Sequence, residues 1–318
     1  MNLYRSVRAV AGASGDHAVD WGAAAEAAKA STDPGSIDLE PGEREGYARD
    51  VRDARREVRA VGNLEFDVPE VIEIQNRHHW IDANIETFRR VMAPVEDHAG
   101  VFPGVARTVN TGTMGVLLGF LGRNVLGQYD PLLLAETPDR DHALYFVRPN
   151  IKKVAAMLEV EYPRFRRWIA FHEVTHAAEF GAAPWLSDHL EGHMREGIDT
   201  LAEGSFDKNA FRELDATMTV VEGYAELLMD HAFDDEYADL RRKLEARRQG
   251  QNPLQKLFRR ILGLGLKRRQ YERGRDFFDG VVDHGGLEAA GLVWESPENL
   301  PTQDELDAPR AWLRRVHH

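Results

Sequence analysis

The chain has 318 residues, 43% of them hydrophobic, so it can bury a sizeable core in one large domain or two closely packed ones. Its formal net charge of −13 argues against nucleic acid as the main partner, because phosphate binding needs a basic surface. Cysteine is absent, which excludes disulfide frameworks and thiolate metal sites and leaves only histidine and carboxylate side chains as ligands for a transition metal.

Residues 1–100 are expected to form an N-terminal helical region packed on the core. Residues 23–30 are rich in alanine, which favours helix. Residues 43–61 and 78–95 carry apolar side chains near helical spacing, which predicts two amphipathic helices. The many charges of residues 43–61 indicate a solvated helix face and not a binding site.

Residues 101–318 predict one compact, mainly α region with a minor β element. Residues 105–126 are apolar and rich in glycine, which indicates a buried helix or helix pair; residues 127–131 then break it. Residues 142–148 alternate and are rich in β-forming side chains, so we expect a strand there. Nearly all of residues 151–279 reads as helix. No apolar run approaches the ~20 residues that span a bilayer, and we expect a cytoplasmic protein without a membrane partner.

The helix predicted over residues 162–180 contains the sequence His172-Glu173-Val174-Thr175-His176 among bulky apolar residues. Residues four apart lie one turn apart on the same face, so His172 and His176 can reach one metal ion from one side. Glu173 is rotated by roughly 100° from His172, which places it beside the ion, as a base acting on water. We therefore expect a Zn²⁺ site. The alternative is a pair of core histidines satisfied by carboxylates.

A catalytic zinc usually has three protein ligands. The pattern HExxHxxGxxH is excluded, because Glu179 and Ala182 stand where it needs glycine and histidine. A helix predicted over residues 218–231 carries Glu222 and Glu226 four apart on one face, the spacing of the acidic pair in thermolysin-like zincins. We expect Glu222 to be the third ligand and Glu226 to accept a hydrogen bond from the other ring nitrogen of a ligating histidine. The alternative is a solvated acidic stripe.

A second pair of histidines, His189 and His193, is also four residues apart. Its surroundings are polar and interrupted by Gly192, so the pattern favours a surface helix over a rival metal site. His189 could still approach the first site across a helical hairpin.

The motifs of this chain together resemble those of a known family. They follow one another over almost its whole length: VDW at 19–21, LGQYDP at 126–131, FHEVTHAAEF at 171–180, PWLSDHL at 184–190, VEGYAELLMD at 221–230, KRRQYERG at 267–274 and WESPENLPT at 294–302. In these segments the chain resembles the zincin-like proteins of actinobacteria and archaea that are linked to biosynthesis of the deazaflavin coenzyme. The resemblance implies a mainly helical fold with a zincin-like core, His172 and His176 as metal ligands and Glu173 as general base. It supplies no substrate.

Three functions fit these residues. The first is a zinc-dependent hydrolase, most simply a metallopeptidase, in which Glu173 deprotonates the attacking water and then protonates the leaving amine. In that enzyme the strand at residues 142–148 could bind a peptide by edge pairing, and Tyr129 or Tyr271 could stabilise the oxyanion. The second is a non-catalytic protein in which zinc staples helices or a surface binds a partner. The third is a small-molecule hydrolase of coenzyme metabolism.

Overall fold

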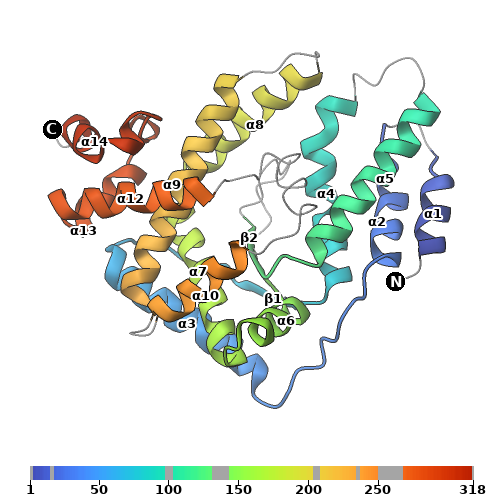
Figure 1. The fold of residues 1–318 in the computed structure, drawn as a ribbon, viewed down its shortest axis with the longest axis horizontal. Helices are drawn as coiled ribbons and strands as arrows, with labels where there is room; N and C mark the ends of the chain where they lie inside the picture. The colour runs from blue at the N-terminus through green and yellow to red at the C-terminus, as the bar shows by residue number, and fades with distance from the viewer. Residues whose placement is uncertain are drawn as a thin grey trace. The chain divides into compact units, whose positions relative to one another are not determined.

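The computed structural model describes residues 3–14, 18–96, 103–130, 143–202, 208–233, 237–249 and 268–316 (Figure 1). The chain forms two compact units that interleave in sequence. The first contains residues 1–39, 70–154 and 194–207, and the second contains residues 40–69, 155–193 and 208–318. These units do not coincide with the expected division into residues 1–100 and 101–318, because the segment 40–69 groups with the helix that carries the HExxH motif.

The first unit is mostly helical, with α1 (Leu3–Ala11), α2 (Trp21–Ala30), α4 (Arg77–Glu96) and α5 (Pro103–Gly122). Helix α2 begins at the N-cap Asp20, whose carboxylate accepts a hydrogen bond from the backbone N–H of Ala23. The alanines of α2 are small, so this helix packs closely on its neighbours. They share a core with larger side chains from α4, α5 and the sheet: Ala24, Ala25, Ala28, Trp80, Ile81, Leu118 and Val147.

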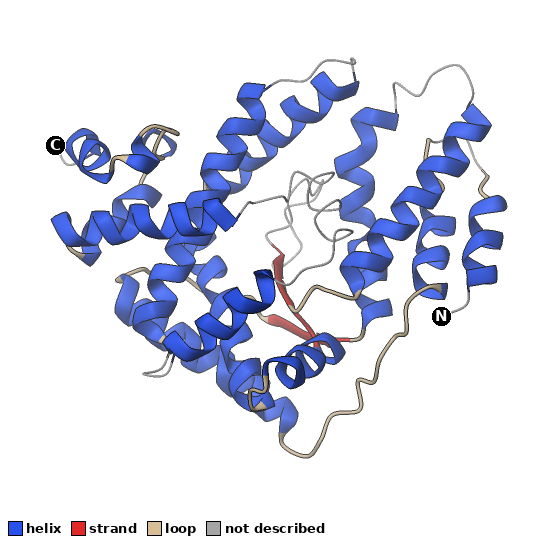
Figure 2. Ribbon diagram, in the orientation of Figure 1, coloured by secondary structure: helices blue, strands red, loops and turns tan. Residues whose placement is uncertain are grey.

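A small sheet completes the first unit (Figure 2). Its strands are β1 (Val71–Gln75), β2 (Gly127–Asp130) and β3 (Ala143–Val147), in the order β1-β3-β2. The parallel partner of β3 is β1, and its antiparallel partner is β2. Sequence analysis predicted β3 alone, since β2 lies in the segment that was interpreted as a break.

This topology corrects one expectation about peptide binding. The strand predicted at residues 142–148 is the central one, and both of its edges are already hydrogen-bonded. Edge pairing of a peptide with β3 is therefore ruled out, because β1 and β2 form the two edges of this sheet among the described residues.

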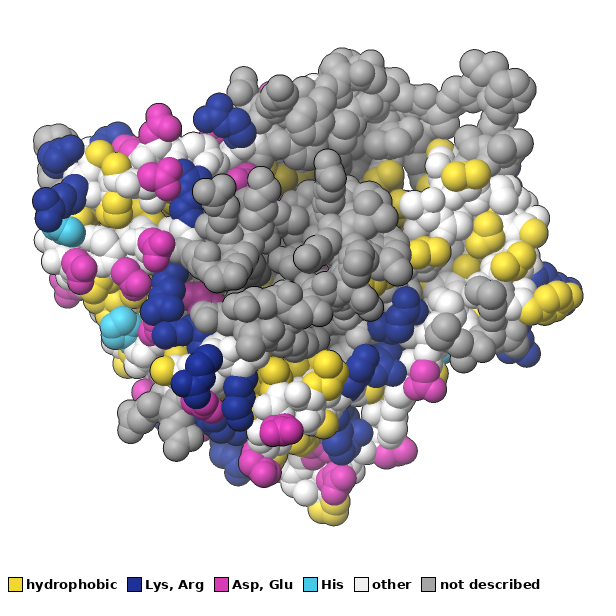
Figure 3. Space-filling view, in the orientation of Figure 1, with side chains coloured by type: hydrophobic (Ala, Val, Ile, Leu, Met, Phe, Trp, Pro, Cys, Tyr) yellow, Lys and Arg dark blue, Asp and Glu magenta, His cyan; other side chains and the backbone are white. Residues whose placement is uncertain are grey.

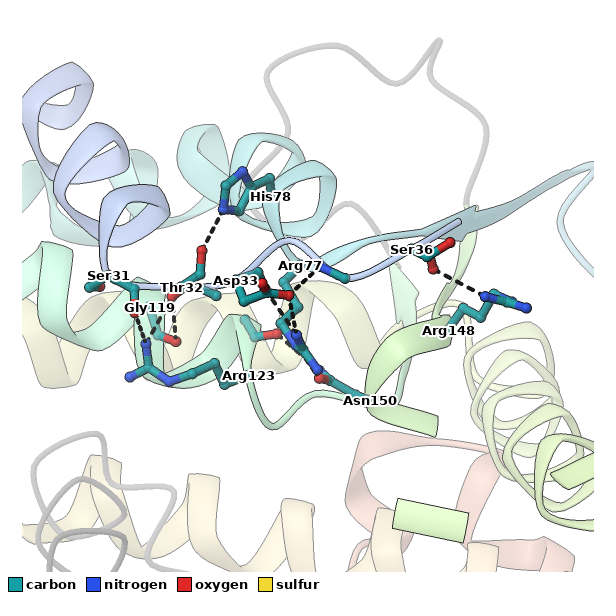
Figure 4. A network of polar contacts seen from close by, with 12 residues as sticks. Ser31, Thr32, Asp33, Ser36, Arg77, His78, Gly119, Arg123, Arg148 and Asn150 are labelled. Carbon is teal, nitrogen blue, oxygen red and sulfur yellow. Dashed lines mark hydrogen bonds and ion pairs between the residues drawn. The ribbon is translucent and has the colours of Figure 1, made fainter. Parts of the chain in front are cut away.

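Side chains from α4, together with Arg123 just after α5, hold the segment that follows α2 (Figure 4). The imidazole Nε2 of His78 lies 2.8 Å from the carbonyl oxygen of Thr32, and Arg77 donates to the carbonyl of Asp33 at 2.9 Å. Arg123 donates to the hydroxyl of Thr32 at 2.8 Å. The contacts of His78 and Arg77 satisfy backbone carbonyls in a stretch that lies outside any helix or strand.

The second unit is also built of helices. The described helices that lie wholly within it are α3 (Glu43–Gly62), α7 (Tyr162–Ala182), α9 (Lys208–Ala232), α10 (Tyr237–Gln249), α12 (Arg268–Gly285), α13 (Leu287–Gly291) and α14 (Pro309–Val316). Three short 3-10 turns lie between α13 and α14, at Leu292–Trp294, Pro297–Asn299 and Glu305–Asp307. Helices α6 (Arg148–Leu158) and α8 (Leu186–Ala202) each run from one unit into the other. The expected mainly α fold with a minor β element is confirmed.

Helix α7 is fixed to α3 by a buried ion pair. Arg166 on α7 donates from Nε to the carboxylate of Asp50 on α3 at 2.7 Å, and both side chains are buried. The guanidinium also lies over the ring of Tyr47, 5.1 Å from its centroid. Because removal of either charge would leave the other buried and unpaired, this contact holds α7 in a defined position against α3.

The charged side chains on the face shown in Figure 3 are of both signs and interspersed. The net charge is therefore not gathered into one acidic region on that face. None of the helices that the structure describes has the combination of length and apolar character that a membrane span requires.

The backbones of helices α9 and α12 approach each other closely at two glycines, Gly223 and Gly274. A Cβ atom added to Gly223 would lie 2.5 Å from the backbone carbonyl carbon of Gly274. We expect Gly223→Ala to lower the free energy of unfolding by about 1–3 kcal/mol, because the two backbones must move apart. Urea denaturation measures the change.

The matched control is Gly192→Ala. Gly192 lies inside α8, and a Cβ atom there meets nothing within 4 Å. Alanine should raise stability at that position by roughly 0.5–1 kcal/mol. Equal stability of Gly223→Ala and the wild type would contradict the close crossing of α9 and α12.

Candidate metal centre

The HExxH motif lies in the middle of α7 and brings two imidazoles together. The rings of His172 and His176 meet edge to face with centroids 4.6 Å apart, and their Nε2 atoms are 3.3 Å apart. Glu222 on α9 joins them, and the three ligand atoms all lie within 4.8 Å of one another. Within the described part of the chain, this is the one group of three such residues that could hold a metal ion.

The dimensions of this cluster fit zinc. Two nitrogen ligands at a Zn–N distance of about 2.05 Å and a tetrahedral angle are about 3.3 Å apart, which is the separation of the two Nε2 atoms. The Oε2 atom of Glu222 is buried and has no hydrogen-bond partner among the described residues. A buried carboxylate oxygen without a partner is costly, and a cation at this point would satisfy it.

The electrostatics of the cluster also favour a cation. Burial lowers the pKa of His176, but the charge and hydrogen bond of Glu179 and then the charges of Glu222 and Glu173 outweigh it and raise the pKa to about 10. Three carboxylates therefore act on one imidazole. Their negative potential stabilises positive charge at this position, whether it is a proton or a metal ion.

Glu179 is a site residue that the sequence interpretation did not identify. Its side chain is 0% exposed, and its Oε2 atom lies 2.8 Å from Nδ1 of His176. Burial raises the pKa of Glu179 to about 7, although His176 opposes the shift. A proton on Nδ1 directed at this carboxylate leaves the Nε2 lone pair facing the cluster. The signal was available in the sequence, since an acid three residues after the second histidine shares its helix face.

His172 is held by aromatic stacking. Its ring lies nearly parallel to the indole of Trp168, at 8° and a centroid distance of 5.5 Å. Phe165 also stacks on that indole, at a centroid distance of 5.7 Å. The three residues follow one another on α7 at intervals of about one turn, so the helix itself sets the plane of the His172 ring.

Glu226 lies one turn after Glu222 on α9 and is buried, as the shared face predicts. Its Oε2 atom accepts a hydrogen bond from the hydroxyl of Tyr237 at 2.9 Å. The carboxylate at Nδ1 of His176 is that of Glu179. The structure therefore places Glu226 against a tyrosine, and its expected contact with a ligating histidine stays a prediction.

Glu173 follows His172 directly on α7. Its side chain is 7% exposed, and its charge acts on His176. A carboxylate with this position and burial is near the cluster and yet separate from the three ligand atoms. It can take or give a proton there.

The remaining predicted pocket residues have different positions. His189 lies on α8, where its Nε2 atom is 3.3 Å from the hydroxyl of Thr217, and burial lowers its pKa. Tyr129 lies on β2 in the first unit, where burial and Asp130 raise the pKa of its hydroxyl. Tyr271 lies on α12, and its side chain is outside the described residues. A role for either tyrosine at the oxyanion stays a prediction.

The chain is similar to a known protein family and to a solved structure. A family described as zincin-like metallopeptidase matches residues 19–206 and 200–313. The chain is similar to a crystal structure of "a putative hydrolase with a novel fold" from Chloroflexus aurantiacus, with 31% identity and a TM-score of 0.79. That match covers 94% of this chain and 99% of the other. Among curated proteins no match is found. The family implies a divalent metal ion, typically zinc, and the cluster is compatible with it.

The contact between Glu179 and His176 yields a prediction. The neutral amide of Glu179→Gln accepts a weaker hydrogen bond from Nδ1 of His176 than the carboxylate does. The imidazole of His176 is then a poorer metal ligand. We expect zinc affinity, measured by competition with a chromophoric chelator, to fall about 10–100-fold. Glu45→Gln, on the first turn of α3, is the control and should bind zinc as the wild type does. Unchanged affinity in Glu179→Gln would contradict the role of Glu179.

Proposed function

The chain belongs to the zincin-like metallopeptidase family, and from this membership we propose that it is a zinc-dependent peptidase with His172, His176 and Glu222 as metal ligands and Glu173 as general base. The observation that carries the proposal is the cluster of three ligand atoms within 4.8 Å, with the Glu173 carboxylate beside it on the same helix. A purely structural site needs no base at that position. It also closes the fourth coordination position with protein, whereas this cluster offers three protein ligands within the described residues.

Zinc bound there supplies Lewis acidity, which polarises a carbonyl oxygen and makes water acidic near neutral pH. Glu173 takes a proton from the attacking water as the oxygen bonds to the carbonyl carbon. The same carboxyl group then gives this proton to the leaving nitrogen as the C–N bond breaks. Proton and charge therefore balance within one turnover, and Glu173 returns to its ionised form.

Glu179 and Trp168 hold the ligands in position for this chemistry. Glu179 fixes the ring orientation and the tautomer of His176, and Trp168 fixes the plane of His172. The active groups thus lie on rigid helices, which suits a centre that must keep its geometry through turnover.

Two other functions use the same residues. A small-molecule hydrolase, including one linked to deazaflavin coenzyme metabolism, would use the same base and ligands on a different carbonyl or ester group. A non-catalytic zinc protein would keep the ligands and have no use for Glu173. The peptidase is favoured because the family is one of metallopeptidases.

The substitution Glu173→Gln tests the catalytic proposal. We expect the variant to keep its zinc, because the three ligands remain, and to lose activity by about 10²–10⁴-fold, because the base is removed. The assay is digestion of a peptide library by the zinc-loaded full chain, followed by mass spectrometry. Glu161→Gln, at the N-cap of the same helix, is the control.

Two results would contradict the proposal. Equal cleavage by Glu173→Gln and the wild type would exclude Glu173 as the base. A zinc-loaded wild type that cleaves no peptide would leave the peptidase proposal without support and favour a hydrolase of small molecules, which the same pair of proteins can then test on ester and amide substrates.

The substitution Glu222→Ala tests the ligand set. Loss of the third ligand should lower zinc content after dialysis against a weak chelator, as measured by elemental analysis of the full chain. The control is Asp230→Asn. Asp230 lies on the same helix, but its carboxylate pairs with Arg241, so the variant should keep its zinc content. Full zinc retention in Glu222→Ala would exclude Glu222 as a ligand.

A further inference from the structure

The structure forms a second histidine pair whose ring spacing and interplanar angle are close to those of the first. His189 and His193 lie one turn apart on α8, with ring centroids 4.6 Å apart at 76°. The corresponding values for His172 and His176 are 4.6 Å and 73°. Helix α8 continues through Gly192, so the expected interruption does not separate the two rings. Both side chains are half-buried, which leaves each ring partly open to solvent.

Contacts with α9 set the tautomer of His189. The hydroxyl of Thr217 donates its proton to the carbonyl oxygen of Glu213 at 3.0 Å and lies 3.3 Å from Nε2 of His189. With its proton used in that way, the hydroxyl oxygen accepts from His189, which places the ring proton on Nε2. The Nδ1 atom of a neutral His189 ring is then a lone-pair donor, as a metal ligand must be.

A carboxylate lies near this pair. Glu213 stands one turn before Thr217 on α9, and its negative charge acts on His189. Its side chain is exposed, so it can rotate toward the imidazoles. Helix α9 therefore carries a carboxylate near each histidine pair. Glu222 lies at ligand distance of the first pair, whereas Glu213 acts on His189 from outside that distance in this structure.

We propose that His189 and His193 form a second metal site, which binds a late first-row divalent cation such as Zn²⁺, Ni²⁺ or Cu²⁺, with Glu213 as the neighbouring carboxylate. Imidazole is a preferred ligand for these ions. Water completes the coordination, because the pair is half-exposed. The site has two imidazoles and no buried carboxylate, so its affinity is lower than that of the three-residue cluster. It goes beyond the proposed function and does not depend on it.

The test is the difference in metal stoichiometry between variants of the full chain. Metal-free protein is titrated with Zn²⁺ by calorimetry, and bound zinc is counted by elemental analysis after rapid gel filtration. Wild type is expected to bind one more equivalent than His189→Gln or His193→Gln. His231→Gln, which removes a helical histidine whose Nδ1 faces the carbonyl of Leu227, should match the wild type.

The test compares the number of zinc equivalents bound by wild type with the number bound by each variant. It therefore still works if the cluster of His172, His176 and Glu222 binds no zinc. The double variant His172→Gln/His176→Gln should retain the second equivalent. Equal stoichiometry in wild type, His189→Gln and His193→Gln overturns the proposal.

A second measurement needs no substitution and covers the case of variants that do not fold. Diethyl pyrocarbonate modifies accessible imidazoles, and mass spectrometry locates the modified residues. We expect Zn²⁺ to protect His189 and His193 in the wild type and to leave the modification of His231 unchanged. Equal modification of His189 and His193 with and without Zn²⁺ overturns the proposal.

Discussion

The hydrogen bond between Glu179 and His176 is the contact on which the candidate metal centre depends. A carboxylate with no solvent exposure is stable only when it is paired, and the imidazole is its partner. That pairing directs Nδ1 of His176 away from the cluster and Nε2 toward His172 and Glu222. One buried interaction thus pairs the Oε2 atom of Glu179 and orients the ring of His176.

The neighbours of α7 maintain this arrangement. The Asp50–Arg166 pair holds α7 against α3, and the glycine crossing of α9 with α12 holds the helix that carries Glu222. The separation of the two Nε2 atoms, which suits a zinc site, needs such fixed supports. Residues far from the cluster therefore influence it, through the positions of the helices rather than through direct contact.

The two histidine pairs have the same i,i+4 spacing but differ in burial, and burial determines how well each pair is preorganised for a metal ion. Both have rings 4.6 Å apart on a helix. At His172 and His176 a stacked indole, a buried acid and Glu222 surround the rings, so their orientation is set before any ion arrives. At His189 and His193 the rings are half-exposed, and the nearby acid is exposed as well. The first pair is preorganised, whereas the second must order its surroundings on binding, which costs conformational entropy.

Local features could be predicted from the amino-acid sequence, namely the helix of the HExxH motif, the shared face of His172 and His176, and a strand at β3. These follow from helical and strand periodicity, which act over a few residues. Strands β1 and β2 were missed because they are short and exist through pairing with a distant segment. Which acid from a second helix joins the two histidines depends instead on tertiary structure. Periodicity places Glu179 about one turn after His176 on the same helix and puts Glu222 and Glu226 together on one face of another. Only the packing of α9 against α7 brings Glu222 to the two imidazoles, and only the packing of α10 against α9 brings Tyr237 to Glu226.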